Sequence, residues 1–370
     1  MSHRFLLQLL LATLAVSANF PFKAKFGTSP APFLIDVDPS FIEETRVKAS
    51  LARIATDLVQ HVPQDGPPAE NITAIKDYWT HSYNWNETQK RKDAIPLLFV
   101  HGYPGSIIEV ERVIDGLPGF GFSPAPEYPG LGLRESGQAF HKLMLQLGYN
   151  KYIVHGGDLG SHTVRYMAID QPESVRALHT NLWYQVPNQQ DMDNFNAKNS
   201  TAEEAFLINV LATFRITLLG QRQVFGNEPL QWAYAQTDSP VGCAAWILTE
   251  LKGGSPSYDW TLDEIISWTM LLYIQGPFGS ARMYKELSLR GQNPWSGKFD
   301  YIHQPVGITQ FAEQGFITPE DWARRQGNIV FFNHYSSGGH FASWDSPTEL
   351  VADAREFIRP GTAAWDAYQK

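Results

Sequence analysis

The stretch HGGDLGSH, residues 155–162, lies between two segments of different character. The apolar residues of YNKYIV (149–154) before it predict a buried strand. The pattern of SHTVRYMAIDQP (161–172) after it predicts a helix that Pro172 stops. Asp158 is therefore expected on the turn that joins a strand to a helix.

Two further apolar runs have the character of buried strands. The first is AIPLLFVHG (94–102), a nearly continuous apolar run that ends at a turn. The second is GNIVFFNHYSSGGHF (327–341), in which an apolar run leads into a glycine-containing turn. Buried strands that alternate with helices indicate an α/β fold with a mostly parallel sheet. Residues 183–297 have a helical pattern rich in Trp, Tyr and Phe. Because ligands bind at the carboxyl ends of the strands in such sheets, we expect this insertion to be a helical lid over the site.

The residues before the first apolar run have a different texture. Residues 19–92 are polar and dotted with prolines, and FIEETRVKASLARIATDLV (41–59) has apolar residues at helical spacing. The aromatic segment IKDYWTHSYNWNET (75–88) is expected to be a meander packed on a larger unit. The predicted organisation is an N-terminal meander at residues 19–92, a first part of the core at 93–182, a lid at 183–297 and a second part of the core at 298–370.

Composition limits the partners of the chain. Its 370 residues carry a net charge of −9 and contain no basic run, so the sequence has no electrostatic footprint for nucleic acid. The single cysteine, Cys243, excludes an intramolecular disulfide and is expected to be a small core residue within VGCAAWIL.

The first 18 residues predict a secretory signal peptide. Arg4 precedes an apolar run, small residues follow it, and the run is too short for a comfortable membrane span. The alternative is an interfacial or short membrane anchor, which would give weak membrane association. Three Asn-X-Thr sequons, at Asn71, Asn86 and Asn199, suit a glycoprotein of the secretory pathway.

Three turns contain candidate catalytic groups. Residues 156–160, GGDLG, have the form of a nucleophile elbow with Asp in the place of Ser. HGYPGS (101–106) follows an apolar strand, where a backbone N–H of Tyr103 could join that of Leu159 in an oxyanion hole. His340 follows the last apolar strand and two glycines, in the chain order nucleophile then histidine that α/β-hydrolases have.

These ordered motifs resemble the microsomal and fungal type of epoxide hydrolases, a branch of the α/β-hydrolase superfamily. The resemblance covers most of the chain and includes the W…YNW segment of the N-terminal part, HGYPGS, LPGFGFSPAP, AFHKLMLQLGYNKYIVHGGDLGS, LHTNL, DSPVGCAAWI, MYKE and GGHFASWDSP. It implies an α/β-hydrolase fold with a helical lid and an N-terminal meander.

The resemblance also implies a reaction and a set of roles. A small apolar epoxide and water would be the reactants, and neither cofactor nor metal would be required. Asp158 would attack a saturated ring carbon, because a carboxylate is already ionised at neutral pH, and the product would be an ester on Asp158. His340 would activate water against that ester, with the oxyanion held by the N–H groups of Tyr103 and Leu159. Tyr284, in ARMYKEL, would be a lid acid that protonates the epoxide oxygen.

Two polar positions depart from the family pattern. The acid that orients the histidine is expected eight residues before Trp322, where this chain has Gln314 with Glu313 beside it. Either Glu313 serves after a one-residue shift, or the support of the histidine is weakened, because an amide cannot stabilise an imidazolium by charge. Gln221 stands where the family has its second lid tyrosine, and it cannot give up a proton as a phenol can.

Two further departures concern the core and the pocket. Only 11 residues separate Ser106 from Pro118, enough for a helix but not for the return strand of the family, and a similar shortening precedes KRKDAIPLL. Tyr103 and Leu159 replace tryptophans but keep their backbone N–H groups. Leu159 also lacks the indole N–H that binds halide in haloalkane dehalogenases, which disfavours that activity.

Two alternative functions remain open at this point. One is a non-catalytic relative that binds an apolar ligand, which Gln314, Gln221 and the short core motivate. The other is a biosynthetic enzyme in which an internal nucleophile opens the epoxide and forms a cyclic ether.

Overall fold

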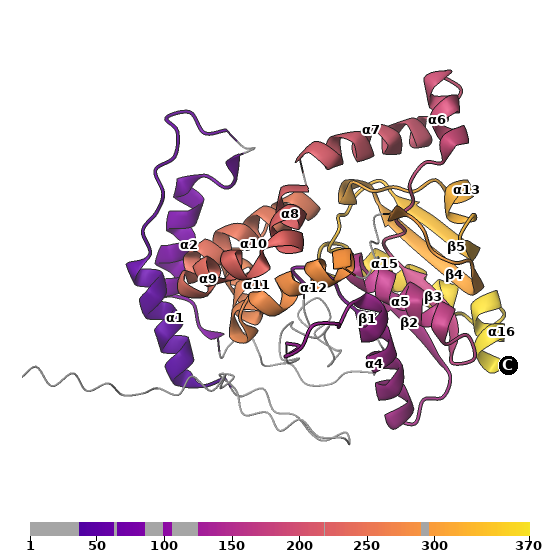
Figure 1. Cartoon of the computed structure of the whole chain (residues 1–370), viewed down its shortest axis with the longest axis horizontal. Coiled ribbons are helices and arrows are strands. Elements are labelled where there is room, and N and C mark those ends of the chain that lie inside the picture. Colours follow the sequence, from indigo (N-terminus) through magenta and orange to yellow (C-terminus); the bar gives the residue numbers. More distant parts are fainter. Residues whose placement is uncertain (1–36, 63–64, 86–98, 106–124, 218, 290–295) are drawn as a thin grey trace, which may run out of the picture.

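A parallel sheet forms the centre of the core in the computed structural model, which describes residues 37–62, 65–85, 99–105, 125–217, 219–289 and 296–370 (Figure 1). The described strands follow the order β1-β2-β3-β4-β5, and every neighbouring pair is parallel. Their bounds are Phe99–Val100, Tyr152–Gly156, Val175–Thr180, Ile302–Phe311 and Gly327–Tyr335. The prediction of an α/β fold with a mostly parallel sheet is confirmed.

Burial distinguishes the inner strands from the last one. Four of the five residues of β2 are buried, and all but one of β3, whereas burial in β5 alternates with exposure. Such alternation is typical of a strand with one solvated face. The sequence did not predict β3 or β4, because both interrupt their apolar residues with polar ones and β4 contains Pro305. The register with β5 shifts between Ile302 and Pro305, as is expected where proline enters a sheet.

Helices cover both faces of the sheet. On one face, α4 (Leu133–Gln146) and α5 (Asp158–Asp170) pack on side chains that share the main core, among them Val154, Leu178 and Val306. On the other face, α15 (Pro347–Phe357) and α16 (Ala363–Gln369) pack through Phe357 and Ala364 on Ala177 and Ile153. Because side chains of a strand alternate between faces, consecutive residues of β2 and of β3 supply the two layers. α5 ends at Asp170, two residues before Pro172, as predicted.

The stretch between β3 and β4 is helical and forms the lid. Its helices are α6 (Gln189–Asn196), α7 (Ala202–Thr217), α8 (Leu219–Asn227), α9 (Pro229–Asp238), α10 (Pro240–Gly254), α11 (Leu262–Gln275) and α12 (Phe278–Leu289). Proline occupies the first turn of α9 and of α10, and the Ser239 hydroxyl caps α10 by accepting from the Gly242 N–H at 3.0 Å. Residues 265–274 of α11 are all buried, so this helix is enclosed by its neighbours.

Two helices of the N-terminal part lie within the described residues, and they pack on the lid. α1 (Pro39–Leu51) and α2 (Ala69–His81) contact each other, and α2 packs on α10 and α11, on the far side of the lid from the sheet in Figure 1. The hydroxyl groups of Tyr83 and Ser267 lie 3.1 Å apart across this contact. The meander expected over 75–88 differs from the structure, because 75–81 form the second half of α2. There Ile75 and Trp79, one turn apart, bury their side chains on the same helix face.

Short helices complete the described chain: η4 (Ala312–Gln314), α13 (Glu320–Ala323) and α14 (Ala342–Asp345). Cys243 is a free, fully buried residue of α10, as expected. Within the described ranges, none of the helices combines the length and the apolar character needed to cross a membrane. The signal peptide (1–18), Asn86 and both shortened segments, before KRKDAIPLL and after Ser106, lie outside the described residues.

Candidate active site

Asp158 stands on a strained turn between β2 and α5. Its backbone φ is 45°, a left-handed value that side-chain-bearing residues rarely adopt. The glycines around it permit close packing: a Cβ atom at Gly160 would lie 1.7 Å from the carbonyl oxygen of Val100, and one at Gly156 would lie 2.5 Å from the carbonyl oxygen of Gly160. Local sequence therefore explains the turn, and the turn presents the carboxylate at the carboxyl end of the sheet.

Two backbone N–H groups act on the Asp158 carboxylate. The N–H of Tyr103 donates to Oδ1 at 2.8 Å, and the N–H of the adjacent Leu159 helps to lower the pKa of the carboxyl group. Gly102 allows this approach, because a Cβ there would lie 2.1 Å from the Asp158 side chain. The structure thus brings together the two donors that the sequence nominates for an oxyanion hole.

His340 lies on the opposite side of the same carboxylate. Its Nε2 is 3.3 Å from Oδ2 of Asp158. The loop that carries it is fixed by its backbone, since the His340 N–H donates to the carbonyl of Gly254 at 2.8 Å and its carbonyl accepts from the Asn181 amide at 3.3 Å. The candidate nucleophile and the candidate base are therefore adjacent, although they are 182 positions apart in the chain.

Electrostatics favours the ionised form of this pair. Burial alone would raise the pKa of Asp158, but the hydrogen bond and charge of His340, with the N–H donors of Tyr103 and Leu159, bring it below its usual value. Burial alone would lower the pKa of His340, but Asp158 outweighs it, with smaller contributions from Asp345 and Glu250, and the net shift is upward. A carboxylate that stays ionised beside a histidine that can accept a proton suits nucleophilic attack followed by hydrolysis.

Tyr284 brings a phenol from the lid to the site. It is buried on α12, and its ring meets that of Tyr103 edge-on with 5.8 Å between centroids. Burial first, and then the charges of Asp158 and Glu250, raise the pKa of Tyr284 well above its usual value. The phenol therefore stays protonated at neutral pH and can donate its O–H.

The expected orienting acid does not reach His340. The Glu313 carboxylate accepts instead from the backbone N–H of Ser257 at 3.2 Å. Gln314 is buried, its amide nitrogen donates to the carbonyl of Phe316 at 3.3 Å, and its Oε1 has no hydrogen-bond partner among the described residues. Within that part of the chain no carboxylate accepts a hydrogen bond from Nδ1 of His340. The one-residue shift that would have brought Glu313 into this role is not what the structure shows.

Asp345 is the carboxylate that supports the His340 loop from behind. Its Oδ2 accepts from the N–H of Gly339 at 3.1 Å and from the hydroxyl of Ser255. The Ser255 hydroxyl in turn accepts from the N–H of Phe341 at 3.4 Å. Asp345 thus supports the backbone of the His340 loop, and its charge also helps to raise the pKa of His340.

Sequence reasoning missed Glu250, an acidic residue of the lid. The pKa of its carboxyl group is raised to about 7, mainly by burial and also by the charge of Asp158, while the charge of His340 opposes the rise. In the amide orientation that satisfies its neighbours, Nε2 of Gln221 lies 3.1 Å from both carboxylate oxygens of Glu250. The available signal was helical spacing, because Glu250 lies one turn after Trp246 and two turns after Cys243.

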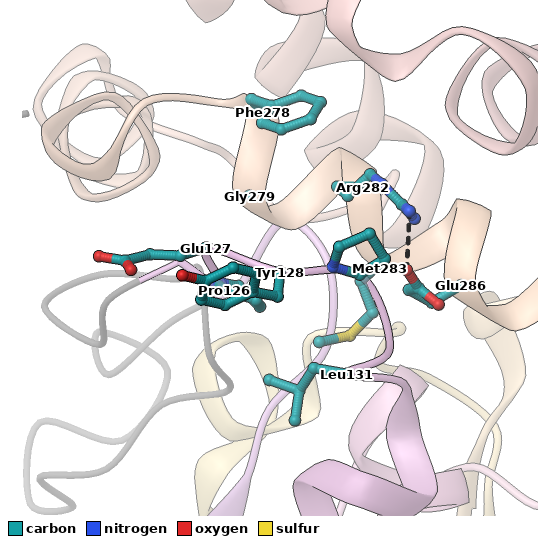
Figure 2. A pocket seen from close by; sticks show the side chains of 10 residues that line it. Pro126, Glu127, Tyr128, Leu131, Phe278, Gly279, Arg282, Met283 and Glu286 are labelled. Atoms are coloured by element: carbon teal, nitrogen blue, oxygen red, sulfur yellow. Dashed lines mark ion pairs between the residues drawn. The ribbon is translucent and has the colours of Figure 1, made fainter.

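A cavity of about 180 Å³ lies on another face of α12 (Figure 2). The side chains of Tyr128, Leu131, Phe278 and Met283 line it, whereas Asp158, His340 and Tyr284 do not, so it is separate from the candidate site. At its edge the carboxylate of Glu286 pairs with Arg282 at 2.7 Å and accepts from the N–H of Gly130 at 3.0 Å. These contacts attach the helix of Tyr284 to the core.

The sequence of the chain is similar to those of known epoxide hydrolases. Residues 30–92 match the family model "Epoxide hydrolase N terminus". Epoxide hydrolase 1 of Sus scrofa is 28% identical over 400 residues, covering 88% of each chain. Juvenile hormone epoxide hydrolase 1 of Ctenocephalides felis is 24% identical over 389 residues, covering 87% of this chain and 84% of that one.

Solved structures show the same fold. The Aspergillus niger epoxide hydrolase superposes with a TM-score of 0.76 at 22% identity, covering 89% of this chain and 96% of that one. The juvenile hormone epoxide hydrolase of Bombyx mori gives a TM-score of 0.78 at 23% identity, covering 91% and 94%. In its matching N-terminal segment, its full-length relatives and its α/β-hydrolase fold, the chain is similar to the epoxide hydrolases of the microsomal and fungal type.

Proposed function

We propose that the protein hydrolyses a small apolar epoxide to a vicinal diol through an ester on Asp158. The observation that carries this proposal is the placement of one buried carboxylate between the N–H of Tyr103 and the imidazole of His340, at 2.8 and 3.3 Å. A buried aspartate in such a setting, on an elbow where related folds have serine, is suited to displacement at a saturated carbon.

In the first step, Asp158 attacks a ring carbon. Oδ1 is engaged by a backbone N–H, so Oδ2 is the oxygen that forms the new C–O bond. The ring C–O bond breaks, and its electron pair remains on the epoxide oxygen. The O–H of Tyr284 stabilises that oxygen as its negative charge develops. Once that oxygen takes up one proton, the result is a hydroxyalkyl ester on Asp158.

In the second step, His340 activates water. Its neutral Nε2 accepts a proton as the water oxygen attacks the carboxyl carbon of Asp158. The N–H groups of Tyr103 and Leu159, which hold the carboxylate before the reaction, then stabilise the tetrahedral oxyanion. As this intermediate collapses, its bond to the diol oxygen breaks, that oxygen takes a proton from His340, and the diol leaves. The Asp158 carboxyl group passes its own proton to His340 and keeps one oxygen of the water.

The destination of that oxygen tests the mechanism. A single turnover of styrene oxide by excess protein in ¹⁸O-labelled water should place the label in Asp158, found by mass spectrometry of the peptide, and leave the first diol unlabelled. Label in the diol alone would contradict the ester mechanism. Bound substrate without turnover would favour the non-catalytic alternative, and a cyclic ether from a substrate with an internal hydroxyl group would favour the biosynthetic one.

We also propose that the protein passes through the secretory pathway. The apolar N-terminal segment supports this, as do two sequons on the surface, since Asn71 and Asn199 are both exposed. Expression in a secreting eukaryotic host should yield protein in the medium whose mass falls after treatment with an N-glycosidase. Full retention in the cytosol without glycans would contradict the proposal.

A further inference from the structure

Helices α8 and α10 face each other in the lid through two matched pairs of residues. Gln221 and Phe225 are one turn apart on α8, and Trp246 and Glu250 are one turn apart on α10. The centroids of the Phe225 and Trp246 rings lie 5.5 Å apart, and the Gln221 amide nitrogen lies 3.1 Å from both oxygens of Glu250. Because residues four apart share a helix face, the two contacts belong to one interface.

This interface reaches the reacting groups at both ends. The ring of Phe225 meets that of Tyr284, with 5.3 Å between centroids. One turn after Glu250, the carbonyl of Gly254 accepts from the N–H of His340 at 2.8 Å. Glu250 therefore lies on the stretch of α10 that connects the lid phenol to the base.

The charges around Glu250 couple it to the reaction. Burial and the charge of Asp158 raise its pKa and the charge of His340 lowers it, and the net value is about 7. Glu250 in turn adds to the rise in the pKa of Tyr103 and of Tyr284. These four groups are the titratable neighbours that act on Glu250, or on which it acts, within the described residues.

One cation adjoins this set. Arg222 follows Gln221 on α8, and burial lowers its pKa to about 10, so its guanidinium remains charged at neutral pH. It acts on Asp158 and on Tyr284, whose pKa it lowers. The lid thus carries Glu250, whose carboxyl group titrates near neutral pH, and Arg222, whose guanidinium stays charged there.

We propose that Glu250 is the second acid of the site, and that its carboxyl group, held by Gln221, donates a proton to the oxygen released from the epoxide. This inference rests on the proposed function. A phenol is implied at position 221 by the family resemblance, but the amide found there cannot release a proton. The carboxyl group 3.1 Å from that amide can.

The proton balance closes with His340. When Asp158 opens the ring, the epoxide oxygen takes the proton of the Glu250 carboxylic acid, and the N–H of Gln221 stabilises the carboxylate that remains. Hydrolysis of the ester then releases one proton to His340. That proton returns through water to Glu250, which lies on the same helix as the Gly254 carbonyl that anchors the histidine. One proton is consumed in the first step and one is released in the second.

The pH dependence of ester formation tests the assignment. Rapid mixing with styrene oxide, acid quenching and mass spectrometry of the Asp158 peptide give the rate of this step alone between about pH 5.5 and 9.5. In the wild type the rate should fall as pH rises through about 7, because the acid form of Glu250 is lost. In Glu250→Gln that fall should disappear, and the rate at pH 6 should be about a hundredfold lower.

Two variants separate proton transfer from packing. Glu228→Gln changes an exposed glutamate at the start of α9 and should leave both the rate and the profile unchanged. Adding Gln221→Tyr to Glu250→Gln supplies the phenol that position 221 lacks. The double variant should form the ester at least about tenfold faster at pH 6 than Glu250→Gln alone. Titration of His340 persists in every variant, so only the difference between variants reports on Glu250.

The outcomes distinguish the two proposals. A wild-type protein that forms no ester on Asp158 overturns the proposed function, and the role of Glu250 with it. Normal ester formation in the wild type, with the same rate and pH profile in Glu250→Gln, overturns the role of Glu250 and leaves the proposed function intact. Failure of Gln221→Tyr to restore any rate to folded Glu250→Gln also overturns it, because the lost function would then not be proton donation.

Discussion

The nucleophile turn and the surroundings of the base are built in different ways. At the turn, the groups that hold Asp158 are backbone N–H groups of residues beside glycines, fixed by the ends of β1 and β2. Around His340, Gln314 stands where the family resemblance implies an acid, and the carboxylate of Asp345 acts on the loop backbone instead of the imidazole. The first arrangement depends on main-chain geometry, whereas the second depends on the choice of side chains.

This difference matters for what substitutions can change. Backbone donors survive any side-chain replacement that leaves the turn intact, as Tyr103 and Leu159 illustrate in place of two tryptophans. A side-chain carboxylate disappears with a single substitution. The hydrolytic half of the site, which depends on the support of His340 by side chains, is therefore expected to be the slower one.

Removal of the nucleophile should have the largest effect. Asp158→Asn keeps the shape of the side chain but removes its charge, and diol formation should fall by at least about 10⁴-fold. The pKa of His340, measured by NMR, should also fall, because Asp158 is what raises it. Residual turnover within tenfold of the wild type would contradict the role of Asp158.

The second-largest effect is expected from a substitution that distorts the backbone of the turn. Gly160→Ala places a Cβ 1.7 Å from the carbonyl oxygen of Val100, so strand β1 and the elbow cannot keep their positions. The free energy of unfolding should drop by about 3 kcal/mol or more in denaturant titration. Gly253→Ala is the matched control, because a Cβ there meets nothing within 4 Å and α10 should be stabilised by about 0.5–1 kcal/mol. Equal effects of the two substitutions would contradict the close packing of the elbow.

Sequence predicted the parts of the site that follow from short patterns. A glycine-flanked Asp158 after an apolar strand, and His340 after another, each identify a strand end without knowledge of the rest. Strands β3 and β4 escaped prediction because His179 and Pro305 interrupt their apolar residues, which only the surrounding layers bury. Glu250 escaped it because its partner, Gln221, lies on another helix, and only packing of the lid brings the two together.

A carboxylate at the position where the family resemblance implies the orienting acid should strengthen the hydrolytic half. Gln314→Glu is nearly isosteric, and its negative charge should raise the pKa of the His340 imidazole further and speed hydrolysis of the ester about tenfold. Single-turnover decay of the Asp158 ester measures this rate. The neighbouring control, Glu313→Gln, should leave the rate within about twofold, because that carboxylate is turned to the backbone of Ser257. A larger loss in Glu313→Gln than gain in Gln314→Glu would mean that Glu313 reaches His340 during the reaction.

The smallest expected effect is a shift in pH dependence at Asp345. Asparagine at this position keeps an oxygen that can accept from Gly339 and Ser255, so the loop should hold, but the charge that helps to raise the pKa of His340 is lost. Hydrolysis of the ester needs neutral His340 and should rise with pH through the pKa that the imidazole has in the ester, where the charge of Asp158 is absent and that of Asp345 remains. In Asp345→Asn this rise should occur at lower pH and reach the same plateau.

The raised pKa of His340 also determines how the free energy of unfolding should depend on pH. Because the pKa of His340 is raised in the folded protein, its contribution to stability is complete below its usual pKa of 6.5 and is lost as pH rises through the raised value. Asp345→Asn should therefore lower the free energy of unfolding at acidic pH and converge with the wild type at alkaline pH. A lowered plateau of the hydrolysis rate with an unchanged midpoint would show instead that Asp345 acts only by positioning the loop, and would place the weakness of the hydrolytic half in geometry and not in charge.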